Sequence, residues 1–273
     1  MGLVINGRVV DVPGVSSVTS FKDDKKMVLR AGEDMRIRRT SWVRSIVLHT
    51  TKGIPGGKLS HIPQKILPGL GPNTDAESRI ARMWSTNKKP GGAHLICDFD
   101  ASWGCLADLA TDAAFHAKQV NDYSIGIEIF QGSDAEMYEE QLDSVVVMLD
   151  FLTWKFKIQR QYQRKYYGRA IPRLLAADAA ASCVGIFGHR DCSNNRGEGD
   201  PGDRIFEKLG AAGYEPVDFE IDEDRNLWRL RQQNMGIEPA DGIAGPGTAE
   251  ALLADGKRDG MWVQRPYHHG ADQ

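Results

Sequence analysis

The sequence lacks any long hydrophobic run. Hydrophobic residues occupy 41% of its 273 positions, yet no stretch approaches the roughly 18 consecutive apolar residues of a membrane-spanning helix. Residues 1–7 also lack the basic start and apolar core of a signal peptide. We therefore expect a chain that is made in the cytoplasm and does not associate stably with a membrane.

The sequence also lacks a large excess of either positive or negative charge. Lys and Arg number 34 against 37 Asp and Glu, so the net charge is −3 and nothing global attracts nucleic acid. Basic residues do gather at 36–39 and 155–165, and we interpret these clusters as a solvated strand edge and a solvated helix face. We expect no nucleic-acid partner.

Cysteine is sparse. The chain has four cysteines, at positions 97, 105, 183 and 192. Without a signal peptide to direct the chain to an oxidising compartment, we expect all four to be reduced.

The apolar pattern predicts a mixture of strands and helices. Residues 124–129 alternate cleanly, with Ile125, Ile127 and Ile129 on one face of a strand. Further strands are expected at 46–49, 93–97, 105–109 and 185–188, and helices at 75–84, 135–166 and 172–182. The predicted fold class is α/β, with a central mixed sheet flanked by helices.

The N-terminal part differs from this central region. Residues 1–41 read as short strands separated by turns, for example at 9–12 and 27–29. We predict that this strand-rich extension continues the sheet.

The composition shifts again after Gly213. An acidic linker at 215–224 precedes a segment of short helices. We predict a small all-α C-terminal module at 219–258, followed by a flexible tail at 259–273.

Two histidines each close a short apolar strand. His49 follows residues 46–48, and His189 follows residues 185–188. Two such strands can bring both imidazoles to one edge of a sheet. Two imidazoles and a third protein ligand, with a fourth position open, form the ligand set of a catalytic zinc. The residues alone leave Cys192 and Asp200 as candidates for the third ligand.

Two further residues are candidates for acid–base chemistry. Glu128 lies on the face of its strand opposite the three isoleucines, where it is either a surface carboxylate or a group that moves protons during hydrolysis. His116 is either structural or a donor to a substrate carbonyl.

Five motifs together resemble the zinc-dependent N-acetylmuramoyl-L-alanine amidases, a family that includes phage endolysins and peptidoglycan recognition proteins. The resemblance covers about residues 42–210. On this basis we predict a catalytic domain at residues 42–214. The resemblance implies that His49, His189 and Asp200 hold one zinc ion per chain, with Glu128 as catalytic acid/base and His116 as a catalytic residue near the substrate. The motifs lie at residues 46–51, 114–117, 124–128, 188–191 and 200–202.

One position departs from the family pattern. Members often carry a Lys two residues before the third ligand, where it stabilises the oxyanion, and this chain has Glu198 there. Either Arg196 replaces that charge from a shifted position, or His116 carries more of the stabilisation. Thr50, Arg196 and Glu198 are our candidate substrate contacts.

The C-terminal segment resembles a peptidoglycan-binding three-helix module, with its signature at residues 227–233 and 241–252. The two resemblances imply a monomeric enzyme that cleaves the amide between the N-acetylmuramic acid lactyl group and L-alanine in bacterial peptidoglycan. It would reach the cell wall, and act as an antimicrobial lysin, after release or specialised export. The alternatives are a recognition protein of the same fold that does not cleave, and an enzyme that acts on soluble muropeptides.

Overall fold

The computed structural model describes residues 2–27, 29, 37–38, 42–51, 64–86, 91–175, 180, 183–194, 196 and 199–219. The chain divides into two compact units, Met1–Val217 and Asp218–Gln273. Apart from Phe219, the predicted C-terminal module and the tail lie outside the described residues. None of the helices in the described part is long and apolar enough to cross a membrane.

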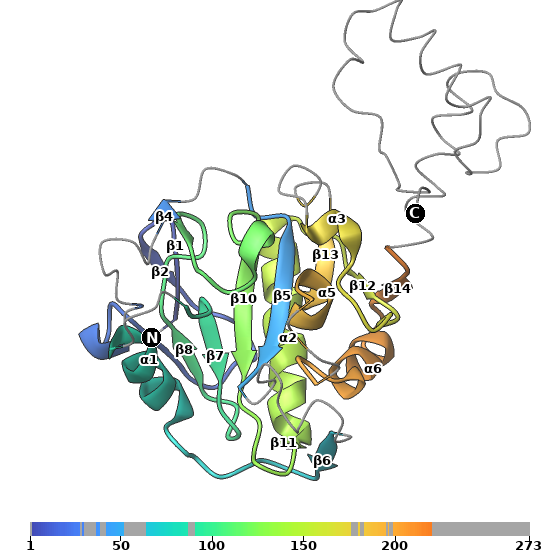
Figure 1. Cartoon of the computed structure of the whole chain (residues 1–273). Helices are drawn as coiled ribbons and strands as arrows, with labels where there is room; N and C mark the ends of the chain where they lie inside the picture. Colours follow the sequence, from blue (N-terminus) through green and yellow to red (C-terminus); the bar gives the residue numbers. More distant parts are fainter. Residues whose placement is uncertain are drawn as a thin grey trace, which may run out of the picture. The chain divides into compact units, whose positions relative to one another are not determined.

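An eight-stranded mixed sheet forms the centre of the first unit (Figure 1). Its neighbours pair in parallel except β7 and β8, which are antiparallel. The predicted central mixed sheet is therefore confirmed. In spatial order the strands are β14 (Glu215–Val217), β12 (Gln161–Gln163), β13 (Gly185–Gly188), β5 (Ser45–Thr50), β10 (Ser124–Ile129), β7 (Leu95–Cys97), β8 (Trp103–Cys105) and β3 (Val18–Ser20).

One face of this sheet packs against α2 (Glu139–Phe156), which runs behind β5 and β10 in Figure 1. The three alternating isoleucines of β10 join the buried cluster that holds the apolar side of α2. Because side chains alternate along a strand, Gly126 and Glu128 point to the opposite face. The predicted alternation is thus confirmed, and it leaves Glu128 on the face that α2 does not cover.

A second, smaller core lies on that other face. Ile80 of α1 (Ala76–Thr86) packs with Ile96 of β7, whereas the flanking Leu95 and Cys97 belong to the α2 core. Helices therefore flank the sheet on both faces, as predicted. The remaining helices among the described residues are α3 (Pro172–Leu175), α5 (His189–Cys192) and α6 (Asp203–Ala211), with 3-10 turns η1 (Lys25–Met27) and η3 (Lys118–Val120).

One N-terminal strand extends the main sheet as expected, whereas the first two strands form a separate two-stranded sheet. Strands β1 (Leu3–Ile5) and β2 (Arg8–Val10) form a hairpin, whose turn places Asn6 and Gly7 at φ 49° and 72°. Strand β3 pairs with β8 and becomes the edge of the main sheet. The strand expected at 27–29 is wrong at both of its described residues, because Met27 ends the turn η1 and Leu29 lies in no strand.

Two element boundaries differ from prediction. The helix expected at 135–166 spans only Glu139–Phe156, because Lys157 adopts a left-handed conformation that ends it. The flanks instead form β11 (Glu136–Tyr138), which pairs with β6 (Lys65–Leu67), and β12. The strand expected at 105–109 lies at Trp103–Cys105.

The third predicted helix and the four cysteines remain to be compared with the structure. The helix expected at 172–182 begins at Pro172 as predicted, and residues 176–179 and 181–182 lie outside the described residues. All four cysteines are buried and none is joined in a disulfide, and the expected reduced state stays a prediction. The last short pair joins β4 (Ile37–Arg38) to β9 (Asp112–Ala113).

We predict that Ile127→Ala destabilises the fold by about 2–5 kcal/mol, because it removes a fully buried side chain from the central strand and leaves a cavity. Urea unfolding followed by circular dichroism measures the change. The matched control is Val9→Ala, at a side chain 45% exposed, which we expect to shift the free energy of unfolding by under about 0.5 kcal/mol. Equal effects would show that β10 is not the core strand.

Candidate metal centre

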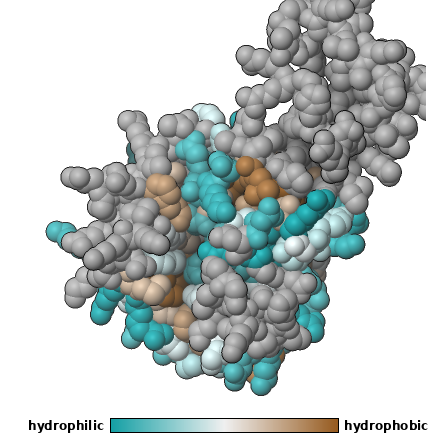
Figure 2. Space-filling model, viewed as in Figure 1, coloured by the Kyte–Doolittle hydropathy of each residue, from teal (hydrophilic) through white to brown (hydrophobic). Residues whose placement is uncertain are grey.

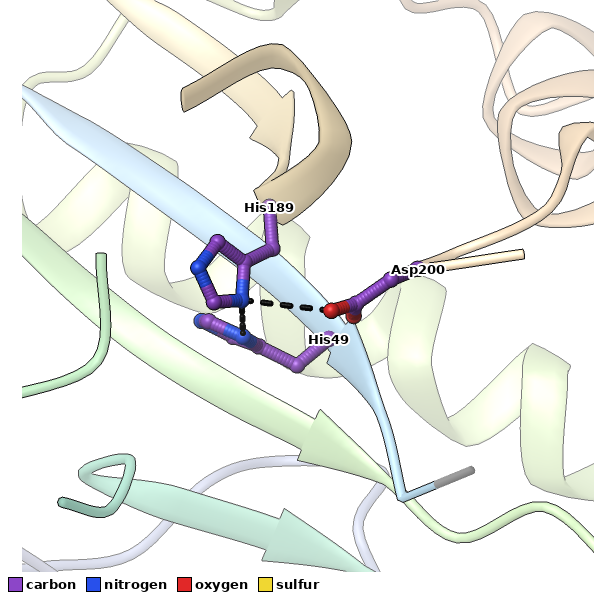
Figure 3. Close-up of side chains that lie close together, drawn as sticks. All are labelled: His49, His189 and Asp200. Atoms are coloured by element: carbon purple, nitrogen blue, oxygen red, sulfur yellow. Dashed lines mark hydrogen bonds and ion pairs between the residues drawn. The ribbon is translucent and has the colours of Figure 1, made fainter. Parts of the chain in front are cut away.

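The pairing of β5 with β13 brings the two predicted histidines together. Gly188, the last residue of β13, pairs with Leu48, so His49 and His189 follow side by side at the same edge of the sheet. Asp200 reaches this edge from the loop before α6. Figure 3 shows the two rings beside each other, with the Asp200 carboxylate at the side of His189.

The three side chains form a tight, buried cluster. The Nδ1 atoms of His49 and His189 are 2.9 Å apart, and Asp200 Oδ2 lies 3.2 Å from His189 Nδ1 (Figure 3). One ligand atom from each residue lies within 4.8 Å of the others, and every residue is at most 4% exposed. Cys192, the other candidate for the third ligand, is buried in α5 and is not a member of the cluster.

Burial sets the protonation of the cluster. Desolvation lowers the pKa of His49 well below its ordinary value, and the neighbouring His189 lowers it further. Desolvation, followed by the charges of Arg196 and Lys118, lowers the pKa of His189 to about 3. Both imidazoles are therefore neutral near pH 7, which is the form that binds metal. Two nitrogens and one carboxylate oxygen fit zinc by donor type.

The end of β5 holds the Asp200 loop in place. The Thr50 backbone N–H donates to Asp200 Oδ1 at 3.1 Å, and the Thr50 hydroxyl donates to the Gly199 carbonyl at 2.6 Å. The sequence predicts Thr50 as a substrate contact, but this side chain is 4% exposed and engaged with the loop. Its observed contacts are those of a residue that positions the carboxylate.

Arg190 is a residue that the sequence analysis missed. Its backbone N–H donates to the Asp200 carbonyl at 2.8 Å, which links the two ligand-bearing segments directly. Its guanidinium is 2% exposed, pairs with Asp203 at 2.6 Å, and lies over the rings of Tyr166 and Phe206. The only sequence signal was an arginine directly after a strand-ending histidine.

A pocket of about 310 Å³ opens beside the cluster. Glu128 and Arg196 line it together with both histidines, and apolar side chains such as Ile80 and Trp84 line it as well. Hydrophilic and hydrophobic residues also lie interspersed on the face of the molecule viewed in Figure 2. The pocket therefore suits a ligand that has both polar and apolar parts.

Glu128 is the titratable group best placed for proton transfer. It pairs with His49 in the register of β10 and β5, so both side chains leave the same face of the sheet. Desolvation, followed by the charge of Asp200, raises the pKa of Glu128 to about 8. A carboxyl group whose pKa lies near neutrality can both accept and donate a proton under working conditions.

The remaining predicted residues have mixed outcomes. His116 lines the pocket, but His49 Nε2 lies 3.0 Å from its Nδ1, and Ser124 Oγ lies 3.1 Å from its Nε2. Arg196 lies with its Nε 3.5 Å from Asp200 Oδ2. Glu198 lies outside the described residues.

A buried His–His–Asp cluster next to a pocket with a titratable glutamate is typical of metal-dependent hydrolases. Comparison with protein families agrees with that class. Residues 39–203, more than half of the chain, match the family model described as N-acetylmuramoyl-L-alanine amidase. The chain belongs to this amidase family, as the motif resemblance predicted.

Solved structures with similar chains include amidases and recognition proteins. Amidase LysC from Clostridium intestinale URNW is 16% identical, with a TM-score of 0.41 over 72% of this chain and 97% of that one. Drosophila peptidoglycan recognition protein SD is 12% identical, with a TM-score of 0.43 over 74% and 97%. At these values the likenesses add nothing to the family assignment. No curated protein sequence matches the chain.

We predict that Thr50→Val destabilises the protein by about 1 kcal/mol, because the Gly199 carbonyl loses its donor. Thermal and urea unfolding measure the effect. Thr111→Val, at an exposed threonine, is the matched control and should change stability by under about 0.5 kcal/mol. A Thr50 variant as stable as this control would show that the hydroxyl does not hold the loop.

Proposed function

We propose that this protein is a zinc-dependent enzyme that hydrolyses the amide between the lactyl group of N-acetylmuramic acid and L-alanine in peptidoglycan. The observation that carries the proposal is the convergence of His49 Nδ1, His189 Nδ1 and Asp200 Oδ2 beside a pocket that Glu128 lines. Membership of the amidase family supports the choice of bond.

His49, His189 and Asp200 would hold one zinc ion per chain. When bound, zinc polarises a substrate carbonyl and makes water a stronger nucleophile near neutral pH. The burial of the three ligands keeps competing water away from them. The neutral state of both imidazoles means that neither has to lose a proton to ligate.

Glu128 would move the proton that hydrolysis requires. Its carboxylate accepts a proton from the attacking water and delivers it to the departing L-alanine nitrogen. The raised pKa of about 8 favours the second step, because a carboxyl that holds its proton near neutrality is an effective acid. A cation bound at the neighbouring ligands would lower this pKa and make the basic form available for the first step.

Arg196 would supply positive charge for the oxyanion that forms during attack. Its guanidinium lines the pocket and is held near Asp200, and its side chain is 26% exposed. The family's usual lysine position is Glu198 in this chain, so Arg196 would act from a position two residues earlier. A fixed cation of this kind contributes to the rate because it stabilises charge that develops only in the transition state.

The parts of the chain beyond the site fit the same substrate. Residues 219–258 would form a peptidoglycan-binding module that keeps the enzyme on its insoluble polymer and raises the local substrate concentration. The proposed binding partner is bacterial peptidoglycan, and the protein itself would be a monomer. The protein would be made in the cytoplasm and reach the wall after release or specialised export.

The decisive experiment incubates the purified full chain with isolated sacculi and identifies soluble products by mass spectrometry. We expect free stem peptides with an L-alanine amino terminus, lost when a chelator removes zinc and restored when zinc returns. Tight binding of zinc and sacculi without released peptide would contradict the enzyme and favour a recognition protein. Release from soluble muropeptides but not from sacculi would contradict the polymer as substrate.

Glu128→Gln should leave zinc binding unchanged and lower the rate of peptide release by about 10²–10⁴-fold, because the amide cannot exchange the proton. Metal content by atomic emission and product release by chromatography measure the two effects. Glu140→Gln, at an exposed position on α2, is the matched control and should match wild type in both. Wild-type release by the Glu128 variant would refute its role.

A further inference from the structure

His116 lies behind a metal-ligand candidate. It precedes η3, is 8% exposed, and packs against Gly126 of β10. A Cβ added at Gly126 would lie 2.6 Å from Cγ of the His116 ring, so the ring can approach the strand this closely only because the residue is glycine. The ring of His116 therefore has a fixed place next to His49.

The hydrogen bonds around His116 have a defined direction. The Ser124 hydroxyl lies 2.7 Å from the Val120 carbonyl, which can only accept, so Ser124 donates its one proton there. At its 3.1 Å contact with His116 Nε2, Ser124 must then be the acceptor, and Nε2 carries the ring proton. In a neutral His116 this leaves the lone pair on Nδ1.

The hydrogen bond between His116 and His49 also has a defined direction. Nε2 of His49 lies 3.0 Å from the His116 Nδ1 lone pair, so His49 Nε2 carries the proton and donates. The lone pair of the neutral His49 is then on Nδ1, which is the atom 2.9 Å from His189 Nδ1. With a neutral His116, the hydrogen bonds therefore run in one direction from His49 through His116 and Ser124 to the Val120 carbonyl.

We propose that His116 is a positioning residue that fixes His49 in the tautomer whose Nδ1 lone pair faces His189 and Asp200. This inference rests on the proposed function, since it assigns His116 a task toward the same metal. It replaces the role that the sequence predicted for His116. Both of its ring nitrogens are engaged with protein groups, which leaves no N–H directed at a substrate carbonyl.

Fixing this tautomer would make His49 a better ligand for zinc. A histidine whose non-ligating nitrogen donates its N–H to an acceptor is held in orientation and becomes more basic at the ligating nitrogen. Most ligating histidines donate to a carboxylate, a carbonyl or water. Here the acceptor is an imidazole, whose own tautomer depends on the buried hydroxyl of Ser124.

The test compares zinc affinity across His116 variants of the full chain by competition with a colorimetric chelator. His116→Phe keeps a ring of similar size without an acceptor, and should weaken zinc binding by about 10–100-fold. His116→Asn offers an amide oxygen at the place of Nδ1 and should recover most of the loss. The absorption spectrum of the cobalt-substituted protein should change in the Phe variant and return toward wild type in the Asn variant.

A serine pair provides the matched control. Ser124→Ala removes the acceptor that holds the His116 tautomer and should weaken zinc binding by less than His116→Phe does. Ser144→Ala removes a buried hydroxyl that accepts from the Trp103 indole at 2.8 Å, on the other face of the sheet. It should lower the melting temperature but leave zinc affinity unchanged.

The outcomes separate this inference from the proposed function. Zinc affinity that is weakened in the Phe variant and recovered in the Asn variant would support positioning even if no variant released peptide. His116→Phe that binds zinc as wild type does, with an unchanged cobalt spectrum, would overturn the inference whatever its effect on hydrolysis. A wild-type protein that binds no zinc would overturn both.

Discussion

The site depends on parallel pairing at the middle of the sheet. Strand β5 lies between β13 and β10 and pairs in parallel with both, so the three strands end at one edge. That register sets His189 beside His49 on one side and Glu128 across from His49 on the other. A slip of one residue in either pairing would turn a side chain to the opposite face, where α2 covers the sheet. The position of the chemistry is therefore a consequence of strand register.

The same arrangement concentrates polar groups where they are costly to bury. Two imidazoles and a carboxylate are almost completely enclosed, and desolvation is the first cause of each of their pKa shifts. Contacts from Thr50 and Arg190 offset part of this cost by giving Asp200 and its loop defined donors. A bound cation would offset more, since it would compensate the buried negative charge. The contacts of Thr50 and Arg190 thus hold the Asp200 segment in place beside the two histidines.

Much of the site could be predicted from sequence because strand periodicity is a local signal. His49 and His189 each end an apolar strand, and Glu128 alternates with isoleucines, so their placement followed from short patterns. The third ligand could not be chosen in this way, because Cys192 and Asp200 are both suitable donors and only the path of the loop separates them. Arg190 and Thr50 were beyond reach for a related reason. Their roles depend on contacts between segments about 10 to 150 residues apart.

The helix expected at 135–166 failed for a different reason. Its apolar spacing at 142–152 is real, but the ends of a helix are decided by single residues such as Lys157. The positioning role proposed for His116 could not be predicted from the sequence either. It follows from the direction of hydrogen bonds and from one glycine that permits close contact, and neither has a sequence pattern of its own.

The two edge strands of the main sheet matter for any fragment that contains the family segment alone. Strands β3 and β14 close the sheet at its two ends, yet both lie outside residues 39–203. A fragment cut to the family segment would leave β8 and β12 as open edges, with unpaired backbone groups ready to bind another chain. In the intact protein β14 carries Pro216, which has no N–H to offer a further strand. We therefore expect the strands that flank the family segment to make pairing between the sheets of two chains less favourable.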